Sequence, residues 1–208
     1  MAGACLKTEG GRFERPKARW TFPVFETGAI SHSANPRLLR SAGGRRKRLG
    51  GSFGRRILGN RERGFIMARV HDVAAYILGE RGSMTTWKLQ KLVYYSQAWS
   101  LVWDDKPLFQ ARIEAWANGP VVPVLYSHHR GAYQISHWPN GSRSGLTTKE
   151  RETVDAVVNF YGPKTSQWLS DLTHLEAPWI NARKGLAPGE RGNVEITPAA
   201  MLEYYSSL

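Results

Sequence analysis

Asp171, His174 and Glu176 form the group of residues that most resembles catalytic machinery. A spacing of three places Asp171 and His174 on one helix face, where a carboxylate can orient an imidazole for acid–base catalysis. Thr173 is the nearest hydroxyl, but adjacent helical residues do not face each other, so no nucleophile accompanies the pair. A histidine in the last turn of a helix is also typical of structural contacts with the terminal carbonyls. The spacing therefore favours a structural or interface role, with a small hydrolase-like enzyme using His174 as the alternative.

Two further motifs are weak candidates for chemistry. His128 and His129 point in different directions, and no Cys or carboxylate lies at metal-ligand spacing, so we expect solvated loop histidines and no metal site. The Gly-rich stretch 141–145 lacks the Lys and Ser/Thr spacing of phosphate-binding loops. No cofactor and no catalytic residue is predicted.

A set of basic and aromatic side chains is a better candidate for binding; its members are Lys88, Lys91, Tyr94, Tyr95, Trp99 and Arg112. Such a patch can stack bases and hold phosphates, and the same residue types anchor protein interfaces. In the alternative interpretation the aromatic rings belong to the core and the lysines form a solvated edge.

Residues 114–120 predict a geometrically demanding corner. Asn118, Gly119 and Pro120 are typical of a turn, and glycine supplies backbone angles that other residues adopt with strain. Glu114 is flanked by apolar residues, so we expect a partly buried carboxylate paired with Lys88 or Lys91.

The elements that position these residues are mainly helical. Apolar residues recur at helical spacing over residues 70–78, 86–103, 154–161 and 198–205. Thr85 or Thr86 is a suitable N-cap, Thr147 with Glu150 forms a capping box, and Thr197 precedes a proline at the first helical position. We predict a mainly α, compact single domain of about six short helices with at most a small β-element, within residues 67–208.

Charge divides the chain into two unequal parts. Residues 1–66 hold 15 Lys and Arg against 4 Asp and Glu, a net charge of +11, whereas residues 67–208 have a net charge of +1. The basic part lacks apolar periodicity, and we expect it to be disordered. It is interpreted as a nucleic-acid-binding arm, a solvated tail, or a start-site artefact with translation beginning at Met67, which is the favoured interpretation.

The bulk composition indicates a cytoplasmic protein without a membrane partner. Cys5 is the only cysteine, so no intrachain disulfide forms and a reducing compartment is expected. No apolar run is long enough to span a bilayer.

Several blocks in order give residues 67–208 a family resemblance. The blocks are Lys88–Trp99, Pro107–Phe109, Glu114–Trp116, Gly119–Pro123 with Tyr126, Leu169–His174, Pro178–Trp179 with Ala182 and Arg183, and Ile196–Tyr205. Together they resemble the SocA-like antitoxin domain, also called the Panacea domain and known through phage-associated GepA-like proteins. Residues 1–66 lie outside the resemblance.

The resemblance implies an antitoxin of a bacterial type II toxin–antitoxin pair, which neutralises a cognate toxin protein, expected to be encoded by a neighbouring gene, through direct binding. It implies no catalytic residues. The predicted partner-binding groove or its support consists of Lys88, Lys91, Tyr95, Glu114, Trp116, His174 and Trp179. A DNA-binding regulator that uses residues 1–66 is a further alternative, because nucleic acid is expected to bind only there.

Overall fold

The computed structural model describes residues 67–208. The predictions of disorder, nucleic-acid binding and a late translation start for residues 1–66 lie outside the described residues. Among the described helices, none is both long and apolar enough to cross a membrane.

Seven α-helices make up most of the described part of the chain: α1 (Val70–Arg81), α2 (Thr86–Asp104), α3 (Pro123–His129), α4 (Thr148–Tyr161), α5 (Ser166–Leu175), α6 (Ala177–Ala182) and α7 (Pro198–Tyr205). Residues 67–208 also contain four short strands: β1 (Met84–Thr85), β2 (Glu114–Trp116), β3 (Gly119–Val121) and β4 (Gln134–Ile135). A single 3-10 turn, η1 (Arg143–Gly145), precedes α4. This architecture confirms the predicted mainly α fold, with one helix more than expected.

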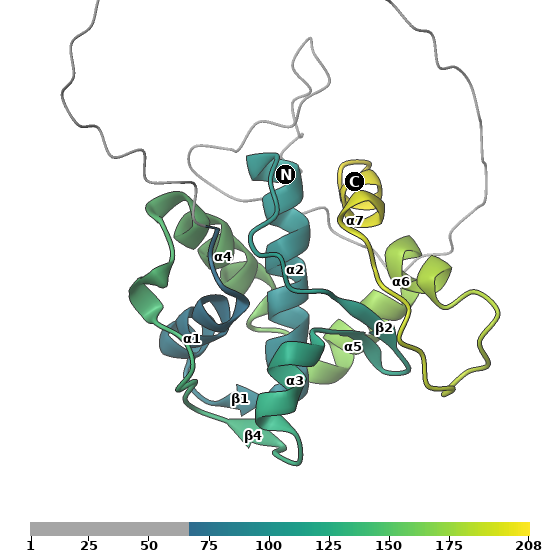
Figure 1. Cartoon of the computed structure of the whole chain (residues 1–208), viewed down its shortest axis with the longest axis horizontal. Helices are drawn as coiled ribbons and strands as arrows, with labels where there is room; N and C mark the ends of the chain where they lie inside the picture. The colour runs from purple at the N-terminus through teal and green to yellow at the C-terminus, as the bar shows by residue number, and fades with distance from the viewer. Residues whose placement is uncertain (1–66) are drawn as a thin grey trace, which may run out of the picture. The chain divides into compact units, whose positions relative to one another are not determined.

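The long helix α2 lies at the centre of the domain. Figure 1 shows α1 and α4 on one side of it and α6 and α7 on the other, and α2 packs directly against α1, α4, α5 and α7. The Thr85 hydroxyl accepts a hydrogen bond from the backbone N–H of Lys88 at 3.2 Å, as the sequence predicts for an N-cap. Side chains on every face of α2 are buried, which is typical of a helix surrounded by other elements.

The peripheral helices begin at caps that the sequence predicts. Thr147 and Glu150 form the complete capping box of α4, and Thr197 accepts a hydrogen bond from Ala200 N at the start of α7. Not every apolar residue of α7 is buried. Met201 and Tyr205 are buried four residues apart, whereas Leu202 lies about 100° further around the helix and is 40% exposed.

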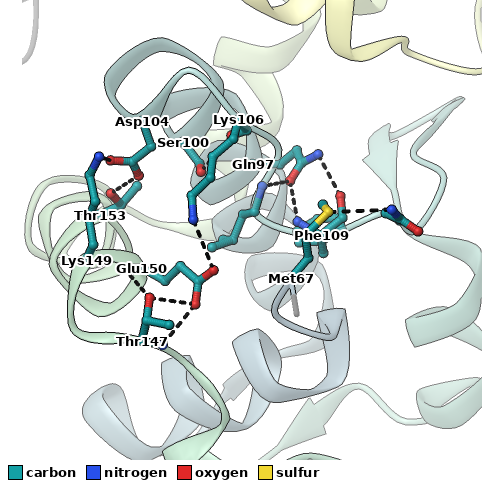
Figure 2. Close-up of polar contacts among 12 residues, drawn as sticks. Met67, Gln97, Ser100, Asp104, Lys106, Phe109, Thr147, Lys149, Glu150 and Thr153 are labelled. Carbon is teal, nitrogen blue, oxygen red and sulfur yellow. Dashed lines mark hydrogen bonds and ion pairs between the residues drawn. The ribbon is translucent and has the colours of Figure 1, made fainter. Parts of the chain in front are cut away.

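The C-terminal end of α2 is joined to the following loop and to α4 by polar contacts (Figure 2). Gln97 Oε1 accepts hydrogen bonds from Leu108 N at 2.9 Å and Phe109 N at 3.1 Å. Its Nε2 donates to Phe109 O at 3.0 Å. Asp104 accepts a hydrogen bond from the Thr153 hydroxyl at 2.7 Å. These contacts hold the chain where it approaches β2.

Strands β2 and β3 form an antiparallel hairpin in which Trp116 pairs with Gly119. Ala115 and the preceding Ile113 are buried, whereas Glu114 and Trp116 are partly exposed, which is the alternation typical of a β-strand. The outer edge of β2 is covered by the segment before α7, since Ala115 N donates to Val194 O at 2.9 Å. The hairpin is thereby fixed between α2 and the C-terminal segment.

Candidate functional site

Lys91 determines the geometry of the hairpin corner. Its Nζ donates hydrogen bonds to Asn118 O at 2.8 Å and Pro120 O at 3.2 Å, and the side chain is buried. Gly119 lies between these carbonyls with φ = 103°, in the left-handed region. A Cβ at this position would lie 2.5 Å from Lys91 Nζ and 2.8 Å from the Thr173 hydroxyl. The corner therefore requires glycine both for its backbone angle and for the space above it.

Glu176 lies in a buried cluster of tyrosines below the corner. Its Oε2 accepts a hydrogen bond from the Tyr205 hydroxyl at 2.7 Å, and its Oε1 accepts one from the Tyr95 hydroxyl at 3.2 Å. The Tyr94 hydroxyl is 3.2 Å from that of Tyr205, and the Tyr95 ring stacks on Tyr161 at 4.1 Å. We call Tyr94, Tyr95, Tyr161, Glu176 and Tyr205 the tyrosine cluster. It joins α2, α4, the start of α6 and α7 around one carboxyl group.

Burial shifts the pKa values of Lys91 and Glu176 in opposite directions. Loss of hydration lowers the pKa of Lys91 from 10.5 to about 7, although the charge of Glu176 opposes the change. Loss of hydration likewise raises the pKa of Glu176 from 4.5 to about 8, against the effect of the Tyr205 and Tyr95 hydroxyls and of Lys91. Both groups are therefore easily neutralised at neutral pH, and neither is exposed for contact with a partner.

Four partly exposed rings form a continuous surface above these buried groups. Trp179 Nε1 donates a hydrogen bond to Trp116 O at 2.9 Å. The His174 ring stacks on Trp179 at 4.3 Å, and the Trp116 ring meets Tyr126 edge-on at 4.7 Å. We call Trp116, Tyr126, His174 and Trp179 the aromatic ledge. Because β2, α3, α5 and α6 each contribute one ring, the ledge exists only in the folded domain.

Two aliphatic side chains next to ledge residues in the sequence are exposed, and a buried arginine supports the ledge. Leu175 is 65% exposed and Ile180 is 46% exposed, and each follows a ledge residue in the sequence. Arg183 donates hydrogen bonds to Ala115 O at 3.1 Å and Glu190 O at 2.8 Å while its guanidinium lies 5.3 Å from the centre of the Trp179 ring. Arg183 thus fixes Trp179 from below through its contacts with the backbone.

His174 does not form the predicted pair with Asp171. Asp171 accepts a hydrogen bond from Gln167 Nε2 at 2.7 Å instead. The buried Nε2 of His174 has no hydrogen-bond partner among the described residues. Burial and then the charge of Lys91 lower the pKa of His174, which keeps the imidazole neutral. A neutral ring stacked on Trp179 is suited to contact with another apolar surface.

Glu114 and Lys88 lie elsewhere than predicted. Instead of pairing with Lys88 or Lys91, Glu114 lies 3.4 Å from Arg112 Nε and accepts a hydrogen bond from Trp116 Nε1 at 2.8 Å. The nearby Arg112 competes successfully because it is two residues away on the same extended segment. Glu114 thereby orients a ledge residue, whereas Lys88 lies in the first turn of α2, apart from the ledge.

The predicted basic and aromatic surface is not formed, because most of its members are buried: Lys91, Tyr94, Tyr95 and Trp99. The alternative interpretation, in which the rings belong to the core, is confirmed for these positions. The prediction that the lysines form a solvated edge is wrong for Lys91, because its ammonium group is bound by backbone carbonyls.

The prediction of solvated loop histidines is wrong in its loop assignment, and solvation holds for the exposed His128 but not for His129. His128 and His129 belong to α3, where His129 is buried and its Nε2 lies 2.8 Å from Gln90 Nε2. Gln90 Oε1 in turn accepts a hydrogen bond from Val122 N at 2.8 Å. Across residues 67–208, no group of three or more His, Cys, Asp or Glu is arranged to hold a metal ion.

The family comparison covers the region that contains the aromatic ledge. The family model of the antitoxin SocA-like, Panacea domain matches residues 89–180, which run from α2 into α6 and include all four ledge residues and Glu176. No curated protein and no solved structure matched the chain. Residues 89–180 of this chain are therefore similar to the antitoxin SocA-like, Panacea domain.

Proposed function

We propose that the chain is the antitoxin of a type II toxin–antitoxin pair. In this proposal it neutralises a toxin protein, encoded by a neighbouring gene of a bacterial or phage genome, by direct binding in the cytoplasm. The family match supports an antitoxin-like role in general. The observation that supports direct binding is the aromatic ledge, together with the exposure of Leu175 and Ile180, which follow ledge residues in the sequence.

The ledge has the properties of an interface centre. Trp and Tyr side chains are enriched among the residues that contribute most to protein–protein affinity, since they bury much area at a small cost in conformational entropy. Here hydrogen bonds already fix the rings of Trp116 and Trp179. Little ordering is therefore required on binding, which favours affinity.

The seven predicted partner-binding residues take different roles in this proposal. Trp116, His174 and Trp179 contact the toxin, and Glu114 orients Trp116 through its hydrogen bond. Lys91 and Tyr95 are buried supports of the surface rather than contacts. Lys88 lies outside the ledge.

Co-expression of the full chain with the product of the neighbouring gene tests this function. The wild type is expected to restore growth and to co-purify with that product. Ile180→Glu places a charge at the edge of the ledge, and we expect it to weaken binding by at least about tenfold, because an unpaired charge is costly in an apolar interface. Growth should then fail.

Val194→Glu is the matched control, because Val194 is 48% exposed, close to the 46% of Ile180, and lies in the segment before α7. It should neutralise like the wild type. Unchanged toxicity with the wild-type chain would refute the antitoxin proposal. If Ile180→Glu neutralised the toxin as well as the wild type, Ile180 would not belong to the interface.

A further inference from the structure

The amino-terminal ends of α2 and α5 meet at a second region of the domain. The hydroxyls of Thr85 and Ser166 lie 2.6 Å apart. Thr85 caps α2 by accepting from Lys88 N, and Thr165 caps α5 by accepting from Trp168 N at 3.1 Å. The first turns of both helices are thus fixed side by side, and their side chains project from one region.

Three cations lie in this region without an acidic partner. No ion pair of residues 67–208 includes Arg81, Lys88 or Lys164. Arg81 donates to Val158 O at 2.7 Å and to Asn159, both at the end of α4. After burial, the charge of Arg81 is the second cause that lowers the pKa of Lys88. Arg81 and Lys88 therefore repel each other, and the amino ends of the two helices add further positive potential.

Exposed aromatic rings accompany the cations. Trp87, in the first turn of α2, is 44% exposed, and Tyr133 is 75% exposed. Tyr133 is held beside α2, since its carbonyl accepts a hydrogen bond from Thr86 N at 3.0 Å. Lys164 Nζ lies 5.0 Å from the centre of the partly buried Trp168 ring. We call Arg81, Trp87, Lys88, Tyr133, Lys164 and Trp168 the cationic surface.

The charge of the chain indicates which kind of molecule binds to the cationic surface. Residues 1–66 carry a net charge of +11, so the basic part of the same chain would be repelled. Nucleic-acid binding generally requires many neutralised phosphates, whereas residues 67–208 have a net charge of only +1 and the surface offers three cations. A peptide with a few carboxylates and one or two apolar side chains matches both the cations and the rings.

We propose that the cationic surface binds an acidic, partly apolar segment of the partner protein. The carboxylates of the segment pair with Lys88, Lys164 and Arg81, and its apolar side chains pack on Trp87 and Tyr133. This inference rests on the proposed function only in that the partner is a protein. It adds a second contact region and defines the chemistry of the segment that occupies it.

Binding of a short fluorescein-labelled peptide of Asp, Glu and Leu to the full chain tests the inference by fluorescence anisotropy. The test variant is Lys88→Glu with Lys164→Glu, and the matched control is Lys184→Glu with Arg191→Glu, two exposed cations outside the surface. Both variants change the net charge equally and keep residues 1–66, so any binding by the basic segment is common to them. Trp87→Ala tests the apolar contact without changing charge.

We expect the test variant to weaken peptide binding by at least about tenfold and the control by no more than about twofold, because only the first reverses charges that face the peptide. Trp87→Ala should also weaken binding, with an unchanged circular dichroism spectrum. Equal affinity for all variants would overturn the proposal. If replacing the same cations reduced the affinity for a single-stranded oligothymidylate probe more than the affinity for the peptide, the proposal would be overturned in favour of nucleic-acid binding.

The outcome is independent of the antitoxin test. Peptide discrimination without neutralisation of the neighbouring gene product would refute the toxin assignment and retain the cationic surface. If the wild type neutralised the toxin but all variants bound the peptide equally, the antitoxin proposal would stand. The proposal that the cationic surface binds an acidic segment would then be refuted.

Discussion

At the scale of single residues, the conformation of Gly119 and the burial of the Lys91 ammonium group depend on each other. Lys91 satisfies two carbonyls that the turn leaves without strand partners, and only the missing side chain of Gly119 leaves space for its ammonium group. The aromatic ledge is built directly on this corner through Trp116. Residues that never touch a partner therefore control the shape of the surface that we propose to bind it.

Gly119→Ala is expected to destabilise the domain by about 2–4 kcal/mol, because it combines left-handed backbone strain with a steric clash against Lys91. Gly131→Ala is the matched control: Gly131 has φ = 85°, but a Cβ there meets nothing within 4 Å. It should cost only the strain, about 1 kcal/mol. Urea denaturation of both variants measures the difference, and equal losses would show that the contact with Lys91 is unimportant.

At the scale of secondary structure, local capping determines where the helices around α2 begin. Thr147 and Glu150 bond reciprocally at the start of α4, and Glu150 Oε1 also lies 3.6 Å from Lys106 Nζ in the loop after α2. The start of α4 is thereby fixed relative to the central helix. This placement matters for the tyrosine cluster, since α4 also supplies Tyr161.

Thr147→Ala removes the acceptor of the capping box, and we expect it to lower the free energy of unfolding by about 1 kcal/mol. Thr148→Ala, at the exposed first residue of α4, should change it by no more than about 0.5 kcal/mol. Thermal or urea unfolding of the two alanine variants gives the comparison. A larger effect at Thr148 would contradict the assigned cap.

At the scale of the whole domain, the tyrosine cluster connects the centre to the C-terminal helix through Glu176. The folded state raises the pKa of this carboxyl from 4.5 to about 8, so between these values it binds a proton that the unfolded chain does not. Stability from this group is therefore present at low pH and is lost as pH rises. The pKa of Lys91 is lowered from 10.5 to about 7, so the stability from this group rises with pH between about pH 7 and pH 10.5.

We therefore expect the wild type to lose stability relative to Glu176→Gln, on the order of 2 kcal/mol, as pH rises from 5 to 7. Histidines with lowered pKa values, such as His71 and His129, titrate in the same range but are common to both proteins. The difference between the two urea midpoints across pH isolates the carboxyl group. A constant difference from pH 5 to 7 would mean that Glu176 is ionised in the folded state.

Features that depend on neighbours within one or two turns can be predicted from the amino-acid sequence. The caps of α2, α4 and α7, the alternation along β2 and the need for glycine at the corner were all predictable, because the interacting groups are at most a few residues apart. Trp116, His174 and Trp179 were also singled out by residue type.

Which of these residues lie at the surface and which support it from the core depends on how the helices pack. Lys91 and Tyr95 are buried because other helices enclose α2, and the Glu176 carboxyl bonds Tyr95 and Tyr205, which lie 81 and 29 residues away. Local patterns carry no information about such distant contacts. The aromatic ledge likewise depends on four elements meeting, so its composition, with Tyr126 included, follows from packing rather than from spacing.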